Sequence, residues 1–125
     1  MIGYVTLGTN DLERATAFYD TLFGEFGGKR TMESDRFVAW SMAPRQPALM
    51  VARPYDGQPM TVGNGAMTAL AVDSKDKVGQ MYEKALSLGA TSEGAVGPRG
   101  TGGFYGGYFR DLDGNKLAVF TIDRG

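Results

Sequence analysis

The chain contains neither histidine nor cysteine, the two side chains that most often act as bases, nucleophiles or metal ligands near neutral pH. Their absence excludes Ser-His-Asp and Cys-His nucleophiles, disulfides, and metal sites built from imidazole or thiolate. A hard metal held only by carboxylates stays formally possible. The side chains left for chemistry are tyrosine, arginine, lysine and the carboxylates.

One pair of carboxylates, Asp111 and Asp113, lies close together in the stretch Asp-Leu-Asp-Gly-Asn. Asp-Gly between two strand-like runs is a strong hairpin signal, and aspartates in such turns bond their own backbone. We therefore interpret both residues as structural.

A glycine-rich segment over residues 97–108 contains Arg99, Tyr105 and Tyr108. It lacks the Gly-Lys-Ser/Thr ending of a phosphate-binding loop, and no helical pattern follows it, so we exclude a nucleotide site. One interpretation is a mobile lip whose arginine and tyrosines reach an anionic or aromatic guest. The other is a long connector that ends in a strand.

Apolar periodicity indicates the elements that must position these residues. A strand-like run at 2–8 precedes a helical pattern at 11–23, and three strand-like runs follow at 29–32, 37–42 and 48–52. The same order then returns: a strand at 67–72, a helical stripe that stops at Gly89, and strands near 91–93, 104–110 and 116–122. Shifting the chain by 63 positions aligns Phe18-Tyr19 with Met81-Tyr82, which indicates an internal repeat.

Three motifs on this repeat resemble a known family. They are the opening strand and helix from Tyr4 to Ala15 followed by Phe18-Tyr19, the Gly63-Asn64-Gly65 entry to the second copy, and the closing hairpin from Tyr108 to Lys116, in which Leu112 replaces a proline. Together they are similar to the vicinal oxygen chelate superfamily, which includes glyoxalase I, bleomycin- and fosfomycin-resistance proteins, and extradiol dioxygenases.

The resemblance implies an α+β fold in a single domain over 1–125, with two βαβββ modules at about 1–57 and 64–125. Their eight strands would form one curved mixed sheet, a cup with the helices outside. It also implies a metal held by His, Gln and Glu side chains at four positions. These positions carry Tyr4, Met67, Ala118 and either Leu49 or Met50 here, so we expect no metal or other cofactor and no metal-dependent activity.

Strand alternation places a mixed set of side chains on the concave side of this cup: Tyr4, Thr6, Met67, Ala69, Ala71, Lys116, Ala118 and Phe120. Such a surface suits a mainly apolar pocket for a small molecule, although the same residues could fill the cup as a second core. Tyr4 would donate a hydrogen bond to a ligand or act as an acid beside Lys116; alternatively, its ring simply packs. Trp40, with Arg36, would stack on a flat ligand or serve as a core anchor.

Two hypotheses follow from the sequence. The first is a metal-free protein that binds a small aromatic or amphipathic molecule. The second is an enzyme without a metal, in which Tyr4 or Tyr105 donates a proton and Arg99 holds an anion. The 13 basic and 14 acidic residues give no excess positive charge for nucleic acid. No apolar run spans a membrane and no secretory signal is visible, so we expect a cytoplasmic protein, and the resemblance implies a homodimer.

Overall fold

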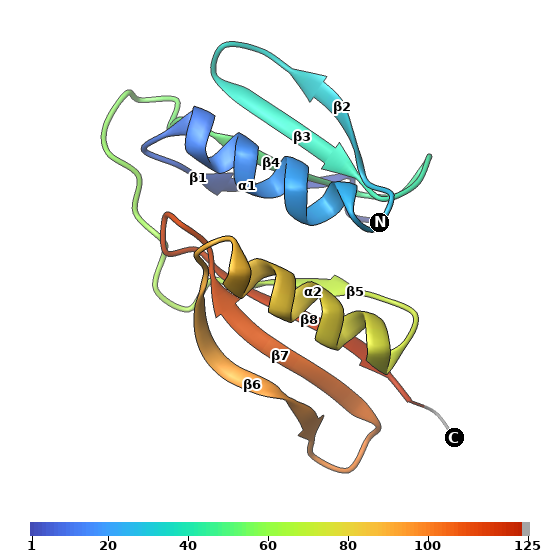
Figure 1. Cartoon of the computed structure of the whole chain (residues 1–125). Helices are drawn as coiled ribbons and strands as arrows, with labels where there is room; N and C mark the ends of the chain where they lie inside the picture. Colours follow the sequence, from blue (N-terminus) through green and yellow to red (C-terminus); the bar gives the residue numbers. More distant parts are fainter. Residues whose placement is uncertain (124–125) are drawn as a thin grey trace. The chain divides into compact units, whose positions relative to one another are not determined.

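Two consecutive strand–helix–strand–strand–strand segments make up the chain (Figure 1). The structure is a computed structural model and describes residues 1–123. The elements of the first segment are β1 (Tyr4–Gly8), α1 (Leu12–Gly24), β2 (Lys29–Glu33), β3 (Phe37–Ser41) and β4 (Ala48–Ala52). Those of the second are β5 (Thr68–Ala71), α2 (Lys75–Ser87), β6 (Thr91–Arg99), β7 (Phe104–Arg110) and β8 (Lys116–Ile122).

The two segments have the same topology. The strand order is β1-β4-β3-β2 in one four-stranded sheet and β5-β8-β7-β6 in the other. In each sheet the first strand runs parallel to the last, and the remaining neighbours are antiparallel. The predicted α+β class and the repeated βαβββ module are thus confirmed, with the eight strands divided between two sheets. The first compact unit is Met1–Gly63, called unit 1 below, and unit 2 begins at Asn64.

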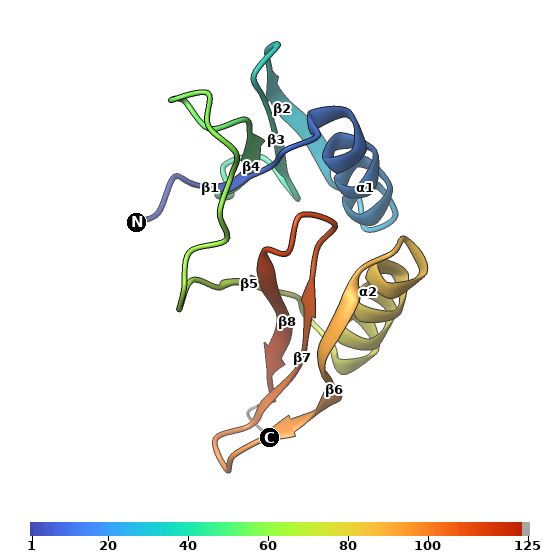
Figure 2. The same ribbon diagram turned by 90° about the vertical axis from the view of Figure 1, so that its left-hand side faces the viewer.

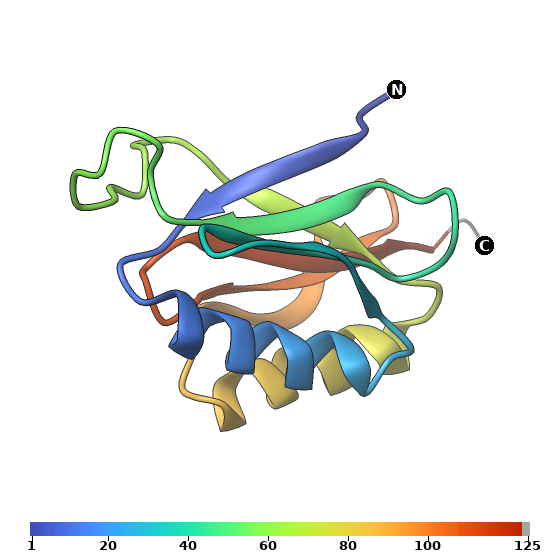
Figure 3. The same ribbon diagram turned by 90° about the horizontal axis from the view of Figure 1, so that it is seen from above.

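Both helices begin at capping side chains that the sequence offers. The Asp11 carboxylate accepts a hydrogen bond from the backbone N–H of Arg14 at the start of α1, and the Ser74 hydroxyl accepts one from Lys77 at the start of α2. Gly89 follows α2 with φ of +108°, a conformation that L-residues rarely adopt, and so ends the helix. Figure 3 shows α1 running along the strands of its sheet.

The core of unit 1 lies between α1 and one face of the β1–β4 sheet (Figure 2). Tyr19 and Phe23 of α1 contact the Trp40 ring, with centroids 5.6 Å and 6.1 Å away. Val38, Leu49 and Val51 are buried with them. The apolar stripe of α1 therefore packs against large side chains of the sheet.

The core of unit 2 lies between α2 and one face of the β5–β8 sheet. Val78, Met81 and Ala85 of α2 are buried, as are Leu117 and Val119 of β8. Neither helix is long and apolar enough to cross a membrane within the part of the chain that the structure describes.

Candidate ligand-binding surfaces

Each sheet has a second face that carries no helix of its own unit, and we call it the open face. In unit 2, a Cβ added to Gly107 would lie 3.0 Å from the Tyr82 ring of α2, so Gly107 faces the helix. Since side chains alternate along a strand, every second β7 residue, beginning with the two neighbours of Gly107, points to the open face. With their partners on β8, they form this set: Phe104, Gly106, Tyr108, Arg110, Lys116, Ala118, Phe120 and Ile122.

Tyr108 lies on the open face of unit 2 between two cations. The Arg99 guanidinium is 5.4 Å from the centre of its ring, and the Lys116 ammonium is 5.6 Å away. Arg99 also donates hydrogen bonds to the backbone carbonyls of Pro98 and Ala95, which fix its position. Within residues 1–123, neither cation pairs with a carboxylate. The arrangement therefore presents positive charge beside an aromatic ring.

A pair of phenylalanines continues this surface. The rings of Phe104 and Phe120 are stacked, with centroids 5.1 Å apart and planes 6° from parallel. Gly106 lies beside them, and a Cβ there would come within 2.9 Å of the Phe104 ring. Arg110, on the same face, is paired with Glu93. The open face of unit 2 thus combines flat apolar groups with two cations that pair with no carboxylate in residues 1–123, which suits a ligand that has an aromatic body and an acidic group.

Tyr105 lies on the opposite face of the same strand. The ammonium of Lys75, on α2, lies 5.3 Å from the centre of the Tyr105 ring and forms a 2.9 Å ion pair with Asp123. This carboxylate raises the pKa of Lys75. The sequence groups Tyr105 with the ligand-binding residues; strand alternation places it on the face toward α2, opposite Tyr108.

The glycine-rich segment forms neither a lip nor a long connector. Strand β6 continues to Arg99, and its residues pair with β7 as far as Phe104. Only residues 100–103 remain as the turn between the two strands, and Gly100 and Gly103 have positive φ there. Arg99 is therefore held at a strand end and not in a flexible loop.

On the open face of unit 1, Tyr4 and Thr6 of β1 lie beside Ala48 and Met50 of β4. Tyr4 is 59% exposed. Met50, rather than Leu49, is on this face, because Leu49 pairs with Trp40 on the face toward α1. In unit 2, Met67 immediately precedes β5 and is 49% exposed, whereas Ala118 is fully buried between Ala69 and Tyr108.

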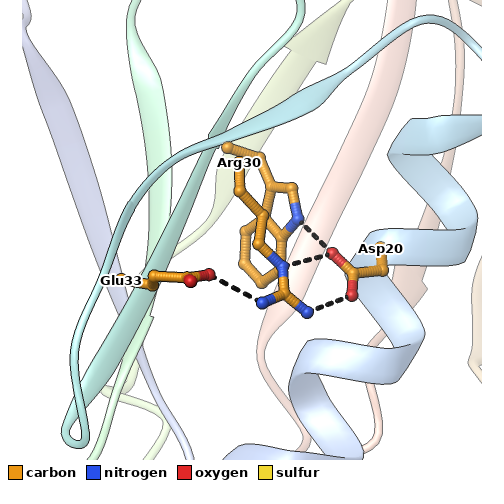
Figure 4. A network of polar contacts seen from close by, with 4 residues as sticks. Asp20, Arg30 and Glu33 are labelled. Atoms are coloured by element: carbon orange, nitrogen blue, oxygen red, sulfur yellow. Dashed lines mark hydrogen bonds and ion pairs between the residues drawn. The ribbon is translucent and has the colours of Figure 1, made fainter.

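Trp40 belongs to the core of unit 1 and is only 2% exposed. Its indole N–H donates a 2.8 Å hydrogen bond to Asp20 of α1, and Asp20 in turn accepts two hydrogen bonds from Arg30. Figure 4 shows Arg30 between Asp20 and Glu33. The hydrogen bond from Arg30 is the main cause that lowers the pKa of Asp20, against the opposing effect of burial. Trp40 therefore packs as an anchor of the unit 1 core, which is the second of the two roles that the sequence leaves open.

The aspartate pair forms the turn that the sequence predicts. One oxygen of Asp111 accepts hydrogen bonds from the backbone N–H groups of Asp113 and Asn115, both at 2.9 Å. The other accepts a hydrogen bond from the Asn115 side chain. Asp111 is 6% exposed and organises the β7–β8 hairpin.

The four positions at which the resemblance implies metal ligands carry Tyr4, Met67, Ala118 and Met50. None of these provides an imidazole or a carboxylate, and an alanine provides no donor at all. Across residues 1–123, no group of three or more His, Cys, Asp or Glu side chains could hold an ion. This donor set does not fit the divalent metal that the resemblance implies.

Sequence reasoning missed a pocket of about 430 Å³ in unit 1. It is lined by Thr6, Gly8 and Ala52 of β1 and β4, by Arg36, and by residues 53–56 and 59–61 of the segment that follows β4. The sequence pattern showed this stretch only as a proline-bearing connector. The available signal was Tyr55, an aromatic residue between Pro54 and Pro59 that turns out to be 91% exposed.

Comparison with protein families identifies one match over almost the whole chain. Residues 1–119 match the model of the Glyoxalase/Bleomycin resistance protein/Dioxygenase superfamily. No curated protein matches the sequence.

Solved structures show the same fold. A glyoxalase/bleomycin resistance protein from Albidiferax ferrireducens is 30% identical, with a TM-score of 0.88 over 98% of this chain and 99% of that one. A lactoylglutathione lyase from Agrobacterium tumefaciens is 21% identical, with a TM-score of 0.72 over 97% of this chain and 92% of that one. A fosfomycin resistance protein from Listeria monocytogenes is 19% identical, with a TM-score of 0.71 over 99% of this chain and 94% of that one.

Proposed function

Because the chain belongs to the Glyoxalase/Bleomycin resistance protein/Dioxygenase superfamily, we propose that it binds a small organic molecule in the sheet cup that the family resemblance implies, without a bound metal. The ligand class is a small aromatic or amphipathic molecule with an acidic group. One observation carries this proposal: Tyr108 lies between Arg99 and Lys116, two cations without a carboxylate partner in residues 1–123.

The chemistry of this surface favours binding. The stacked Phe104 and Phe120 rings and the face of Tyr108 offer flat apolar contacts, while the two cations attract an anion. Arg99 is preorganised by its carbonyl hydrogen bonds, so little of its side-chain freedom is lost when a ligand binds. Tyr105, one of the two proton donors of the enzyme hypothesis, faces α2 and lies opposite the cations of the open face, which favours binding over that reaction.

Binding of 8-anilino-1-naphthalenesulfonate, a fluorescent aromatic anion, tests the proposal. Arg99→Gln and Lys116→Gln should each raise its Kd by roughly three- to tenfold, since each removes one charged contact. Lys84→Gln is the matched control, because it removes the same charge from α2 on the other side of the sheet. Equal affinity in all four proteins would overturn the proposal.

Native mass spectrometry of untagged protein tests the absence of a metal. A tag-free chain is needed because a histidine tag would supply the ligands that this sequence lacks. We expect either no mass excess or an organic adduct. One divalent metal per chain, retained after dialysis, would contradict the metal-free proposal. The same spectrum tests the homodimer that we propose from the family resemblance, which requires twice the mass of the chain.

A further inference from the structure

We propose that the pocket of unit 1 at the end of β1 is a second binding site, specific for a small aromatic carboxylate. It lies wholly within unit 1 and shares no residue with the surface around Tyr108. Its volume of about 430 Å³ falls within the range of small-molecule sites. Because Thr6 also belongs to the concave side of the cup that the family resemblance implies, the inference rests on the proposed function and deepens it, adding a site in unit 1 to the one around Tyr108.

The charge of the pocket favours an anion. Arg36 and Arg53 line it together with a single carboxylate, Asp56. Among the described residues, neither arginine forms an ion pair. One oxygen of Asp56 accepts a 2.9 Å hydrogen bond from the backbone N–H of Gln58, so this side chain is already used to shape the turn.

Arg36 is placed to receive a carboxylate. Its Nη1 donates a 2.9 Å hydrogen bond to the carbonyl of Arg53, which holds the guanidinium at the pocket wall. The hydrogen bonds found for this side chain in residues 1–123 leave its Nε and Nη2 groups without a partner. A guanidinium edge with two such donors matches the two oxygens of a carboxylate.

The remaining wall suits a flat apolar body. The Tyr55 ring lies 5.4 Å from the Arg36 guanidinium, yet 91% of the residue is exposed. Pro54, Pro59 and Met60 add apolar surface around it. Exposed aromatic and proline side chains around a fixed cation are suited to stacking on an aromatic ring.

The loop that carries this wall is held in place before any ligand binds. The backbone N–H of Met60 donates a 2.8 Å hydrogen bond to the Asn10 side chain, at the end of β1. The Met60 side chain also lies directly over Gly8, where an added Cβ would be 2.9 Å from the Met60 Cβ. Arg53 N–H is bonded to the carbonyl of Arg36 at the other end of the loop. This fixed geometry lowers the entropic cost of binding.

The test is a titration of the full chain with 2-naphthoate, followed by ¹H–¹⁵N NMR. We expect amide shifts concentrated in residues 53–61 and around Arg36. The neutral analogue 2-naphthalenemethanol should bind about tenfold more weakly or worse, because it lacks the charge that a guanidinium recognises. Amide shifts confined to unit 2 would overturn this proposal while supporting the site around Tyr108.

Two variants separate the contribution of the Arg36 charge to binding affinity from that of the Tyr55 ring. Arg36→Gln should weaken 2-naphthoate binding by about tenfold or more and abolish the preference over the neutral analogue. Tyr55→Leu should weaken both probes by a similar, smaller factor. Arg45→Gln, at an exposed arginine outside the pocket, is the matched control and should change neither affinity. The proposal fails if Arg36→Gln binds as tightly as Arg45→Gln.

Discussion

Unit 1 makes its aromatic ring contacts beneath its helix, whereas the stacked ring pair of unit 2 lies on the open face of its sheet. Tyr19 of α1 and Tyr82 of α2, which occupy equivalent positions in the repeat, show the difference. The Tyr19 ring meets Trp40, but the Tyr82 ring meets the bare backbone of Gly107. Tyr82 also bonds the Ser92 hydroxyl at 2.6 Å.

The two units therefore share a topology but place their large aromatic side chains on different faces of the sheet. In unit 1 the large rings fill the space between sheet and helix, and the tryptophan N–H is satisfied by Asp20. In unit 2 a glycine lets the helix approach closely, and Phe104, Tyr108 and Phe120 are left for the other face. One repeated topology thus places its tryptophan beneath the helix in one copy and a stacked phenylalanine pair on the open face in the other.

Among the changes that test this contrast, removing Trp40 should lower the stability of the protein most. Trp40→Ala is expected to lower the free energy of unfolding by about 3–5 kcal/mol, because it leaves a cavity beneath α1 and removes the N–H donor to Asp20. Urea unfolding followed by circular dichroism measures the effect. Trp40→Phe keeps a ring against Tyr19 and should cost distinctly less; an equal cost would show that the ring contacts are not what stabilises unit 1.

Adding a methyl group at Gly107 should have the next largest effect on the free energy of unfolding. A Cβ at Gly107 would lie 2.9 Å from Val96 and 3.0 Å from Tyr82, so Gly107→Ala should destabilise the fold by about 1–3 kcal/mol. Thermal and urea unfolding would report it. Gly79→Ala is the matched control on α2, where the added methyl meets nothing within 4 Å. It should stabilise by about 0.5–1 kcal/mol. A neutral Gly107→Ala would contradict the close approach.

The smallest expected effect on stability comes from the ion pair between Arg30 and Asp20, whose carboxylate also accepts the Trp40 hydrogen bond. Arg30 lowers the pKa of Asp20 in the folded state, so the folded protein holds the Asp20 proton less tightly than the unfolded chain. The resulting stabilisation is present above the unfolded pKa and is lost as pH falls through the lower folded value. Asp20→Asn should therefore cost up to about 1 kcal/mol near pH 7, with the difference from the original protein shrinking in acid.

Denaturation curves between neutral pH and pH 2 measure this dependence. Glu25→Gln is the control, because Glu25 forms no ion pair among the described residues. Its stability should follow that of the original protein at every pH. A constant cost of Asp20→Asn across the whole range would show that the Arg30 contact does not depend on the Asp20 charge.

The local pattern of the sequence was sufficient to predict most of the fold. Apolar residues at helical spacing, together with caps at Asp11 and Ser74, place both helices within one or two residues of their observed bounds. The Asp-Gly turn predicts the last hairpin, and the 63-residue register predicts that both units share one topology. The largest error was β6, expected near 91–93, because glycines that usually mark loops here lie within a paired strand.

The sequence by itself determined that this chain repeats a βαβββ module and lacks the side chains of the family's metal site, since both are properties of residue order and residue type. Tertiary structure decided which side chains meet. Alternation along β7 separates Tyr105 from Tyr108, and contact with α1 turns Trp40 inward. It also brought Arg36 to Tyr55, because such contacts depend on how distant segments pack and leave no trace in local spacing.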